Sequence, residues 1–551
     1  MKSYQREIEK KYSKYKETKK KQSYEELCFP KKFSLRKSQQ FPSEYISPNT
    51  KNKNLLLFHQ IGSGKTCTMI RIAEKWKKKR KIIFVCPAGL IGNFMGELRS
   101  QCADDEYLND EERSILKSGT PEQQEKVLQR SDERIKKNYE IYSQHKFASL
   151  LSKKEIDFNN KILLIDEIQN MVSATGTFYK ILLAAINKAP KDLRIILATA
   201  TPMFDRPYEL GLTMNLLRPK EKFPSPVQFT ETFVEKKMEK DKITYSMKNK
   251  QLLEKMLGEN VSYFSGGNPL TMPEKKIIIH KCIMSKYQKK SYLSNLKKSK
   301  HYKKVEEKGM KLNEVFKKGE ILELPNNFFI GPRLLSNISY PEERVSEEGF
   351  KLLKKNTPMK EYSTKIAKMI EIISASKGKS YIYSNFRNYG GLLPIEFALK
   401  NLGYKNYEKF GPGKNRYAFW SGEESRDYRN KVVKEYNSEK NMYGENLKII
   451  MISPAGKEGL SLFGVRDAHI FEPYWNISRI DQIIGRGVRF CSHKLMKKDE
   501  RKVDIHIYLS SLGTKEISID EYIYDMANKK QKLISEFENS LKNVAIDKYL
   551  Y

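Results

Sequence analysis

The chain has 551 residues, of which 39% are hydrophobic, a length and composition typical of about three or four globular domains. No run reaches the roughly 18 apolar residues that a membrane-spanning helix requires, and the N-terminus has no apolar signal core, so the sequence predicts a soluble intracellular protein. The formal net charge is +36, which favours a polyanionic partner, while a lysine-rich composition from an AT-rich genome is an equal alternative.

The cysteines show neither a CxxC pair nor a cysteine and histidine spacing typical of zinc ligands. This pattern argues against structural zinc and against a disulfide framework, and it predicts a reducing compartment. The six cysteines are Cys28, Cys67, Cys86, Cys102, Cys282 and Cys491.

The first 24 residues are charged and lysine-rich, with three lysines at 19–21, and they lack a stable apolar stripe. We therefore expect a solvated helix or a mobile basic arm. Gln39 follows, shortly before a glycine-rich stretch. Because a glutamine amide carries both a donor and an acceptor, Gln39 is a candidate for adenine recognition.

The stretch HQIGSGKT, residues 59–66, lies between an apolar run and a helical pattern. Strand, tight turn and helix in this order are typical of a phosphate-binding loop, in which backbone N–H groups face an anion. Gly62 and Gly64, on either side of Ser63, let the main chain approach the phosphates closely. His59 replaces the first glycine of the general pattern, so the match is to the short form GxGK[ST].

The last two residues of this loop are the candidates for charge neutralisation and metal binding. Lys65 is expected to neutralise the β- and γ-phosphates of ATP, and the Thr66 hydroxyl is expected to hold Mg²⁺. A chance glycine and serine loop with a solvated lysine is the alternative.

About 100 residues after the loop, KILLIDEIQN at 161–170 has four apolar residues followed by two acids. A buried strand delivers such acids at its carboxyl end, next to bound phosphates. We expect Asp166 to hold Mg²⁺ through water and Glu167 to orient or deprotonate the attacking water. An apolar run ending in Asp-Glu is common by itself, so the inference depends on the preceding loop.

Two further apolar runs support a parallel α/β sheet. The run at 82–86 is followed by CPAGLIGNFMGEL, again a strand, a turn and a helix. The run RIILATAT at 194–201 ends in small hydroxyl residues, which can bridge the γ-phosphate site to a neighbouring surface. An ordinary strand end is the alternative for this second run.

From about 219 to 364 the periodicities weaken and charge runs dominate. The segment 286–308 combines many lysines with Tyr287, Tyr292 and Tyr302, which is typical of a nucleic-acid surface. A solvated helical hairpin is an equal alternative. Prolines punctuate the region, which suggests an inter-lobe module with linkers.

A second α/β set follows, without a phosphate loop of its own. Within RIDQIIGRGVR, residues 479–489, the spacing of Gln482, Gly485, Arg486 and Arg489 predicts that they share one helix face. Two arginines there could act as arginine fingers on a phosphate bound in the other lobe, or they could form a solvated basic face. The strands expected in this set are 379–385, 416–420, 447–453, 467–472 and 503–509.

The C-terminal segment from 515 to 551 has helical periodicity, and we expect it to pack on the second lobe. Its apolar positions include Ile523, Met526, Leu533, Phe537 and Leu541.

The order HQIGSGKT, VCPAGLIGNF, LIDEIQ, ATATP, SPAGKEGLS and QIIGRGVR resembles the motif series of superfamily 2 nucleic-acid-dependent ATPases. CPAGLIGNFMGEL, CIMSKYQKKSY and EPYWNISRIDQIIGRGVRFCSH resemble more narrowly a group from large cytoplasmic DNA viruses and yeast cytoplasmic linear plasmids. That group includes the poxvirus early transcription factor small subunit and nucleoside triphosphatase I, and it is related to Swi/Snf-type translocases. The likeness runs from about Phe33 to the C-terminus.

The resemblance implies an α/β protein in which two RecA-like lobes clamp ATP and nucleic acid crosses both. The implied domains are a basic arm (1–28), an ATP-binding lobe (29–219), a helical, basic inter-lobe module (220–364), a helicase C-terminal lobe (365–512) and a helical extension (513–551).

The resemblance also assigns roles at matching positions. Thr199 and Thr201 would couple hydrolysis to nucleic acid. Gly459 would line the nucleotide site between the lobes, and Gln482 with the two arginines would complete it. The segment DEIQ departs from the usual DEAD or DEAH, but Gln169 keeps a side chain able to contact the ATATP strand. The residues expected at the adenine and phosphates are Gln39, Gly62, Ser63, Gly64, Lys65 and Thr66.

The sequence leads first to an ATP-driven motor on nucleic acid, with DNA as the first candidate. The resemblance implies a setting in cytoplasmic transcription, with a dedicated RNA polymerase. A DNA-binding transcription factor subunit in which ATP is a conformational switch is the second hypothesis. An RNA helicase is the third, and it differs from the first in substrate only.

Overall fold

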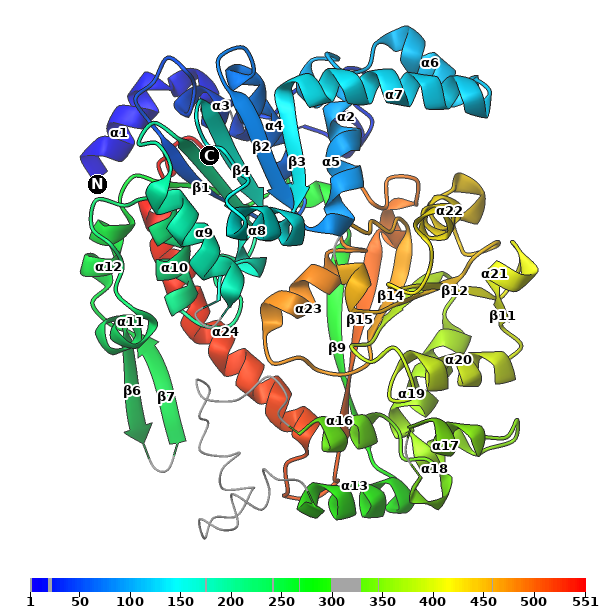
Figure 1. Cartoon of the computed structure of the whole chain (residues 1–551). Helices are drawn as coiled ribbons and strands as arrows, with labels where there is room; N and C mark the ends of the chain where they lie inside the picture. Colours follow the sequence, from blue (N-terminus) through cyan, green and yellow to red (C-terminus); the bar gives the residue numbers. More distant parts are fainter. Residues whose placement is uncertain are drawn as a thin grey trace. The chain divides into compact units, whose positions relative to one another are not determined.

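A computed structural model describes residues 2–17, 22–173, 176–239, 242–266, 268–298, 329–344, 346–457 and 459–551 (Figure 1). The three lysines at 19–21 and the basic segment beyond Lys298, including Tyr302, lie outside these residues. The chain divides into two compact units. Unit 1 comprises Met1–Glu235, Tyr245–Gly267 and Leu533–Tyr551, and unit 2 comprises Lys236–Thr244 and Asn268–Lys532.

Unit 1 is built on a six-stranded parallel sheet in the order β3-β2-β4-β5-β1-β8. Its central strands are continuous apolar runs that are buried along their length, as expected when helices cover both faces. The predicted parallel α/β fold is therefore confirmed here. The strands are β1 (Asn54–His59), β2 (Lys81–Cys86), β3 (Tyr139–Ser143), β4 (Lys161–Asp166), β5 (Arg194–Thr199) and β8 (Val261–Phe264).

The register of this sheet brings three predicted motifs to one edge. Strands β4, β5 and β1 are neighbours, with Asp166 opposite Ala198 and Phe58 opposite Thr199. Because all three strands are parallel, their carboxyl ends lie side by side. The phosphate-binding loop, the acid pair and the hydroxyl strand end thus gather at this edge.

The helices of unit 1 connect these strands. Helix α7 shows the local signals clearly, since Thr120 and Gln123 form a capping box and Pro121 occupies the first turn. The helices are α1 (Lys2–Lys11), α2 (Tyr24–Cys28), α3 (Lys37–Tyr45), α4 (Lys65–Trp76), α5 (Ile91–Leu98), α6 (Asp110–Ser118), α7 (Pro121–Asn138), α8 (Gln144–Ser152), α9 (Thr177–Lys188), α10 (Tyr208–Leu216), α11 (Pro226–Phe233) and α12 (Lys250–Leu257).

The N-terminal segment packs on unit 1. Ile8, Tyr12 and Tyr15 are buried in the same core as Phe41, and the rings of Tyr12 and Phe41 meet edge to face at 5.2 Å. The prediction of a solvated helix or mobile arm is therefore wrong for this segment. Its few apolar residues were too sparse to show a stripe, and only the folded partner reveals the face that they form.

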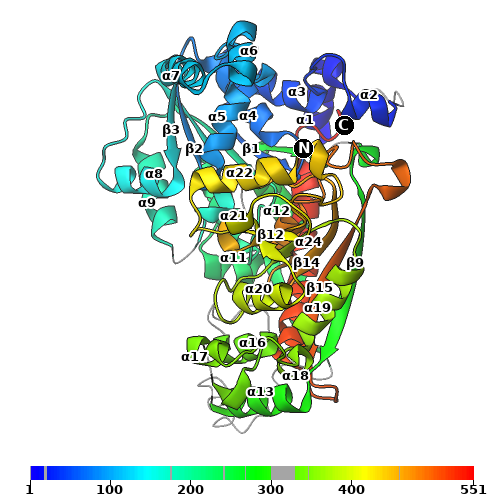
Figure 2. The same cartoon turned by 90° about the vertical axis from the view of Figure 1, so that its right-hand side faces the viewer.

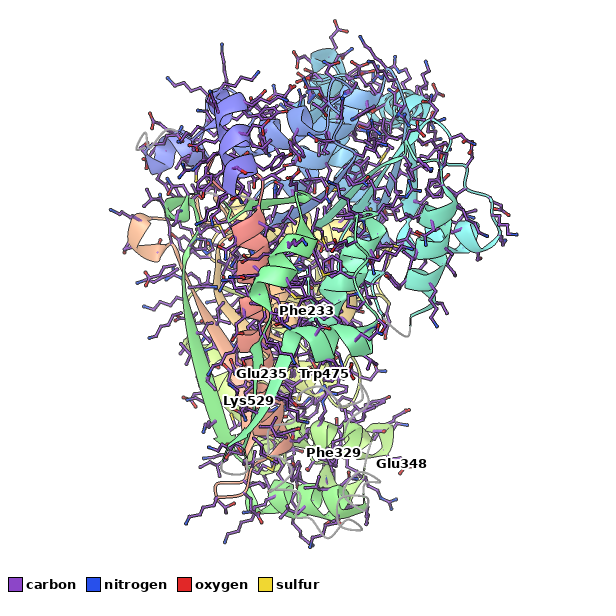
Figure 3. The ribbon with its side chains drawn as sticks, turned by 90° about the vertical axis from the view of Figure 1, so that its left-hand side faces the viewer. Phe233, Glu235, Phe329, Glu348, Trp475 and Lys529 are labelled. Carbon is purple, nitrogen blue, oxygen red and sulfur yellow. A yellow bond between two sulfur atoms is a disulfide. The ribbon has the colours of Figure 1, made fainter. Side chains whose placement is uncertain are left out.

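A two-stranded hairpin, β6 (Val234–Glu239) and β7 (Lys242–Met247), follows α11 directly. Phe233 is labelled with Glu235 in Figure 3, and the centroid of its ring lies 4.8 Å from the ring centroid of Phe229. The ring centroid of Phe229 in turn lies 6.0 Å from that of Phe537. The base of the hairpin is thereby fixed to a helix from the far end of the chain.

That helix, α24 (Ile519–Val544), ends in unit 1. After it, the backbone N–H of Ile546 donates to the carbonyl of Val261 at 2.8 Å. The Gln5 amide donates to the carbonyl of Ala545, also at 2.8 Å. The prediction that the C-terminal segment packs on the second lobe is wrong for Leu533–Tyr551, because an apolar stripe indicates that a helix packs without saying on what.

Unit 2 holds a seven-stranded parallel sheet in the order β11-β12-β13-β10-β14-β15-β9. The five strands expected from the sequence are all present. Strand β9, in the region of weak periodicity, was not predicted. The strands are β9 (Glu274–Ile283), β10 (Lys379–Tyr383), β11 (Lys405–Asn406), β12 (Arg416–Trp420), β13 (Ile449–Ile452), β14 (Val465–Ile470) and β15 (Lys502–Ser511).

A buried ion pair joins two helices of unit 2. Lys365 lies fully buried one residue after the start of α19 and pairs with Asp520 in the first turn of α24. Lys365 also donates to Asn337 Oδ1 at 2.9 Å. The helices are α13 (Lys286–Lys298), α16 (Ile330–Asn337), α17 (Ser346–Lys351), α18 (Met359–Tyr362), α19 (Thr364–Ala375), α20 (Leu392–Asn401), α21 (Tyr407–Phe410), α22 (Arg426–Tyr436) and α23 (Ile477–Ile484).

The two tyrosines of α13 form hydrogen bonds within unit 2. Tyr292 is fully buried, and its hydroxyl accepts the backbone N–H of Ile519 at 3.0 Å. Tyr287 donates to the carbonyl of Tyr340 at 2.7 Å. The expectation of a nucleic-acid surface is therefore wrong for Tyr292, since base stacking needs an open ring face, whereas for half-buried Tyr287 it stays a prediction.

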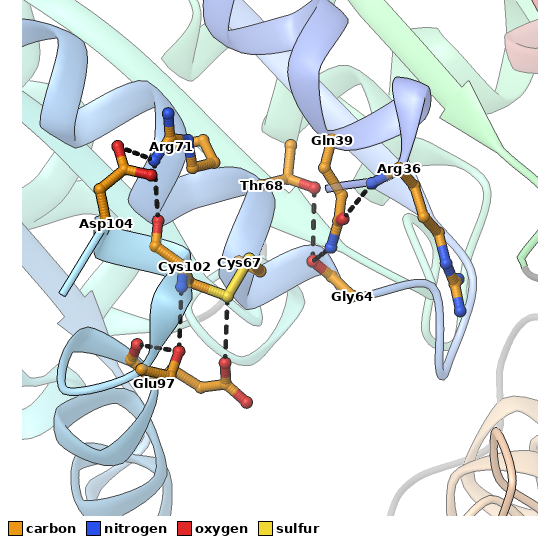
Figure 4. Close-up of a disulfide and its surroundings, with 10 residues drawn as sticks. Arg36, Gln39, Gly64, Cys67, Thr68, Arg71, Glu97, Cys102 and Asp104 are labelled. Atoms are coloured by element: carbon orange, nitrogen blue, oxygen red, sulfur yellow. Dashed lines mark hydrogen bonds and ion pairs between the residues drawn. A yellow bond between two sulfur atoms is a disulfide. The ribbon is translucent and has the colours of Figure 1, made fainter. Parts of the chain in front are cut away.

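A disulfide joins Cys67 in the first turn of α4 to Cys102 in the short helix η3 (Gln101–Ala103) (Figure 4). Arg71 of α4 reinforces the link by donating to the carbonyl of Cys102 at 3.3 Å and to Asp104 at 2.5 Å. The expectation of a chain without disulfides is therefore wrong, because the pairing is made by cysteines far apart in sequence. Cys28 and Cys491 are disulfide-bonded as well, whereas Cys86 and Cys282 are free and buried. Within the described residues, no helix is both long and apolar enough to cross a membrane.

We expect loss of the Cys67–Cys102 bond to destabilise unit 1. The bond closes a loop across a sequence separation of 35 residues, which in the chain-entropy model corresponds to about 4 kcal/mol of unfolding free energy. Cys102→Ser should therefore lower the midpoint of thermal unfolding by roughly 10 °C without reductant. Cys282→Ser, at a free buried cysteine, is the control for the substitution itself. An equal shift in both variants would contradict a stabilising bond.

Candidate nucleotide-binding site

The phosphate-binding loop follows β1 and ends at the first residue of α4. Gly62 and Gly64 have φ of 77° and 83°, a left-handed conformation that glycine adopts without strain. Gly64 is the N-cap of α4, so the free backbone N–H groups of the first helical turn begin at Lys65. The Ser63 hydroxyl is buried and has no hydrogen-bond partner in the described part of the chain. This is the geometry of an anion cradle.

Lys65 lies against the two acids that follow β4. Its Nζ is 3.3 Å from Glu167 Oε1 and 3.7 Å from Asp166 Oδ1. Burial opposes the charge of Lys65, but the attraction of Glu167 and Asp166 outweighs burial, so the pKa of Lys65 lies above its ordinary value. The structure thus brings together the predicted phosphate and metal ligands, with Thr66 next to Lys65 in the same turn.

Glu167 occupies a strained backbone position. Its φ of 50° is left-handed, which is uncommon for residues other than glycine and is typical of functional sites. The Gln144 amide in α8 donates to the carbonyls of Asp166 at 3.1 Å and Glu167 at 3.0 Å. Gln144 was not identified from the sequence, because nothing in its neighbourhood marks it as a partner of the acid pair.

A chain of hydrogen bonds leads from the acids to β5. Gln169 Nε2 donates to Glu167 Oε2 at 2.5 Å, and Gln169 Oε1 accepts from the Thr199 hydroxyl at 2.6 Å. The same hydroxyl accepts the backbone N–H of Thr201 at 2.9 Å. Gln169 therefore makes the contact to the ATATP strand that its amide was expected to allow.

Gln39 of α3 lies beside the loop. Its Oε1 accepts the backbone N–H of Arg36 at 2.9 Å, and its Nε2 approaches the carbonyl of Gly64 at 3.3 Å. A Cβ at Gly64 would clash with this amide, which makes the close approach a second reason for glycine at this position. The structure thus places Gln39 against the phosphate loop (Figure 4).

The C-terminal tail reaches His59 at the start of the loop through Ser262. Asp547 is fully buried and accepts the Ser262 hydroxyl and the backbone N–H of Tyr263, the latter at 2.9 Å. The Ser262 hydroxyl lies 3.0 Å from His59 Nε2. The backbone N–H of Gln60 donates to the last carbonyl of β8 at 3.0 Å. No sequence signal connects Asp547 to the loop, and only the fold places it there.

In unit 2, the predicted shared helix face is wrong beyond Ile484. Helix α23 ends there, with Gly485 as its C-cap, so Arg486 and Arg489 lie in the turns that follow. Glycine has a low helix propensity and favours termination, and this outweighs the apparent spacing. Gln482 remains on the buried side of the helix.

The two arginines nevertheless converge. Arg486 and Arg489 each donate to the carbonyl of Leu460 at 3.2 Å, directly after Gly459, whose φ is 78°. Arg486 also donates to the carbonyl of Gln482 at 3.0 Å. Burial, and then the neighbouring Arg486, lower the pKa of Arg489 to about 10, so the Arg489 guanidinium group is charged at neutral pH.

Comparison with known proteins gives the family. Residues 4–327 match the model of the SNF2-related domain, and residues 364–491 match the helicase conserved C-terminal domain. A protein of Acanthamoeba polyphaga mimivirus, named as an ATP-dependent RNA helicase, is 41% identical over 550 residues, covering 99% of this chain and 94% of the relative.

Two further viral relatives are more distant. The termination factor NPH-I homolog of African swine fever virus (isolate Warthog) is 25% identical over 581 residues, covering 92% of this chain and 78% of the relative. Nucleoside triphosphatase I of Melanoplus sanguinipes entomopoxvirus is 25% identical over 550 residues, covering 90% of this chain and 77% of the relative.

The parallel α/β fold, the phosphate loop and these matches define a superfamily 2 helicase-type ATPase. The chain belongs to the SNF2-related family. It is an ATP hydrolase, and its helicase domains imply that it binds nucleic acid. The resemblance to the Swi/Snf-related group of large DNA viruses is confirmed.

The buried carboxyl of Asp547 predicts a pH dependence of stability. Burial raises its pKa to about 7, so the folded state holds the proton more tightly than the unfolded state does. The stability of unit 1 should therefore fall by a few kcal/mol at most as the pH rises from about 4 to about 7. In a plot of the thermal unfolding midpoint against pH, Asp547→Asn should reduce the slope in this pH range.

Asp499→Asn, at an exposed position, serves as the matched control and should leave the profile unchanged. Two other carboxyls of unit 1 whose pKa values burial raises, Glu209 (to about 7) and Glu97, should contribute a residual slope. An undiminished slope in Asp547→Asn would show that the tail carboxyl does not titrate in this window.

Proposed function

We propose that this protein is a motor that uses Mg-ATP hydrolysis to move along or remodel DNA, in transcription in the cytoplasm of a host cell or in a virion. The observation that supports it most directly is the hydrogen-bond chain from Lys65 through Glu167 and Gln169 to Thr199. A change at the γ-phosphate site would pass along this chain to β5, and from there to the surface that grips nucleic acid.

The residues of unit 1 provide the chemistry of hydrolysis. The hydroxyl of Thr66 and the carboxylate of Asp166 are oxygen ligands of the kind that Mg²⁺ prefers. Bound Mg²⁺ would neutralise charge on the phosphates. Glu167 would orient or deprotonate the attacking water, and Lys65 would stabilise charge on the β- and γ-phosphates.

Other residues are proposed to complete nucleotide binding. Gln39 would contact the adenine from its place beside the phosphate loop. Gly459 and Gln482 would line the nucleotide site on the side of unit 2. Arg486 and Arg489 would stabilise the transferring phosphoryl group as arginine fingers, and planar guanidinium groups suit that role.

DNA and RNA are the two candidates for the bound nucleic acid. The net charge of +36 suits either DNA or RNA. The name of the termination factor relative favours a role in transcription. For such a role we propose DNA as the nucleic acid, and a dedicated RNA polymerase or second factor subunit as the partner. The name of the 41% identical relative favours an RNA helicase, which is therefore the second candidate. A transcription factor subunit with ATP as a conformational switch is the third.

The deciding measurement is steady-state ATP hydrolysis without nucleic acid and with single-stranded DNA, duplex DNA or RNA. We expect DNA to stimulate hydrolysis and the stimulation to weaken as salt rises, because phosphate contacts release counterions. Lys65→Ala should abolish hydrolysis with every nucleic acid. Stronger stimulation by RNA would favour the helicase candidate, and no stimulation would favour the switch. Retained turnover in Lys65→Ala would overturn the site assignment.

Arg489→Ala should leave ATP binding nearly unchanged while turnover falls by about a thousandfold or more, the effect expected of an arginine finger. Nucleotide binding measured by fluorescence titration separates the two quantities. Arg426→Ala, at an exposed position in α22, is the control and should keep full turnover. Weak binding with normal turnover per bound ATP would contradict the finger role.

A further inference from the structure

Strand β9 stands at an edge of the unit 2 sheet and is unusually long for such a position. It pairs with β15 over ten residues, from Glu274 opposite Lys502 to Ile283 opposite Ser511, and among the described residues β15 is its only partner strand. Figure 2 shows β9 at the outer margin of this sheet. A long open edge is a template for pairing with another chain, so proteins usually shorten or cover it.

Apart from the separate hairpin of β6 and β7, the other edges of the two parallel sheets in the described chain follow that rule. Strand β11 has two residues and β3 has five. Strand β8 has four residues, and the C-terminal tail covers it through the bond from Ile546 to Val261 and through Asp547. Strand β9 is the exception.

The hydrogen-bond pattern shows which backbone groups of β9 face outward. The N–H of Glu274 donates to the carbonyl of Arg501, and the N–H of Met284 donates to the carbonyl of Ser511, both at 2.9 Å. In a parallel pair the bonding residues alternate, so the even-numbered residues of β9 bond to β15. The odd-numbered residues, from 275 to 283, therefore direct their N–H and C=O groups away from the sheet.

The same odd-numbered residues present an apolar row. The side chains of Ile277, Ile279 and Ile283 are 49%, 42% and 63% exposed. Their neighbours across the register, Ile505 and Ile507, are buried in the core on that face of the sheet. The isoleucine row thus extends the core face beyond the part that other elements cover, as an interaction site does.

Charge around this row favours an acidic occupant. Lys275 and Lys281 lie on the same face as the isoleucines, and Lys281 also pairs with Glu521 at 3.9 Å. Exposed Lys276 and Lys502 lie on the opposite face of the same edge. Glu274 is the one acidic residue of β9. A second copy of this chain would bring like charges together, which disfavours self-pairing. Nucleic acid would match the lysines but would leave the isoleucines and the backbone groups unmatched.

We propose that β9 is a docking edge for an extended, acidic segment of a partner protein. The segment adds a strand beside β9, hydrogen-bonds to the outward groups of its odd-numbered residues and covers the isoleucine row with β-branched side chains. Its carboxylates face the lysines. This edge is separate from every residue assigned to nucleotide binding, so the proposal stands independently of the proposed function.

The test uses the full-length protein and a fluorescein-labelled nine-residue peptide in which valine alternates with aspartate or glutamate. We expect saturable binding by fluorescence anisotropy, with a dissociation constant of roughly 100 μM or tighter. A peptide with lysine in place of every acid, and one with N-methyl groups on alternate backbone nitrogens, should bind at least about tenfold more weakly. Amide exchange should slow at the odd-numbered residues of β9 when the acidic peptide binds.

Two variants of one residue separate backbone pairing from side-chain contact. Ile279→Pro removes an outward N–H without deleting a bond to β15, and it should weaken peptide binding by at least about tenfold. Ile279→Val keeps the N–H and the β-branch and should bind as the parent does. Both variants should hydrolyse ATP as the parent does, which confirms that they fold.

Three results would overturn the proposal. One is equal or absent binding of the acidic and lysine peptides at about 1 mM. The second is protection of β9 by duplex DNA with no effect of the peptide, which would make the edge a nucleic-acid contact. The third is a dimer in sedimentation that Ile279→Pro converts to a monomer, which would make the edge a self-association surface.

Discussion

A buried cation held between two carboxylates is the interaction on which the nucleotide site depends. The ammonium group of Lys65 is removed from water, and that burial is tolerable only because Asp166 and Glu167 lie within 3.7 Å. Those acids reach it because β4 lies two strands from β1 in a parallel sheet, with β5 between them. The strand order thus determines where the phosphate loop, the acids and the threonines of β5 meet.

Support for this site comes from parts of the chain that are far from it in sequence. Gln144 holds the carbonyls of the acid pair from α8. Asp547, four residues before the C-terminus, contacts Ser262, which in turn contacts His59 at the start of the loop. The first and last segments of the chain also bond to each other through Gln5. Unit 1 is therefore a discontinuous domain whose loop is braced by its own tail.

The two sheets differ in how their edge strands are covered, although both sheets are parallel and built from similar apolar runs. In unit 1 the tail occupies the edge at β8, so the backbone groups there have partners within the chain. In unit 2 the edge at β9 keeps an outward row of backbone groups together with exposed Ile277, Ile279 and Ile283. The chain covers the edge at β8 but leaves the edge at β9 open. This difference supports a binding role for the β9 edge.

The sequence by itself determined the parallel α/β class, the phosphate loop and the acid pair, because these depend on local order: an apolar strand followed at once by the residues that it presents. It also indicated that Gln169 can reach the strand of Thr199. Only the tertiary structure decided what long-range contacts control: the Cys67–Cys102 bond, the burial of Tyr12 and Tyr292, the end of α23 before Arg486, and the unit on which the tail packs. The local sequence shows that a helix face is apolar or that a cysteine is present. Which residues that face or cysteine contacts depends on how the whole chain folds.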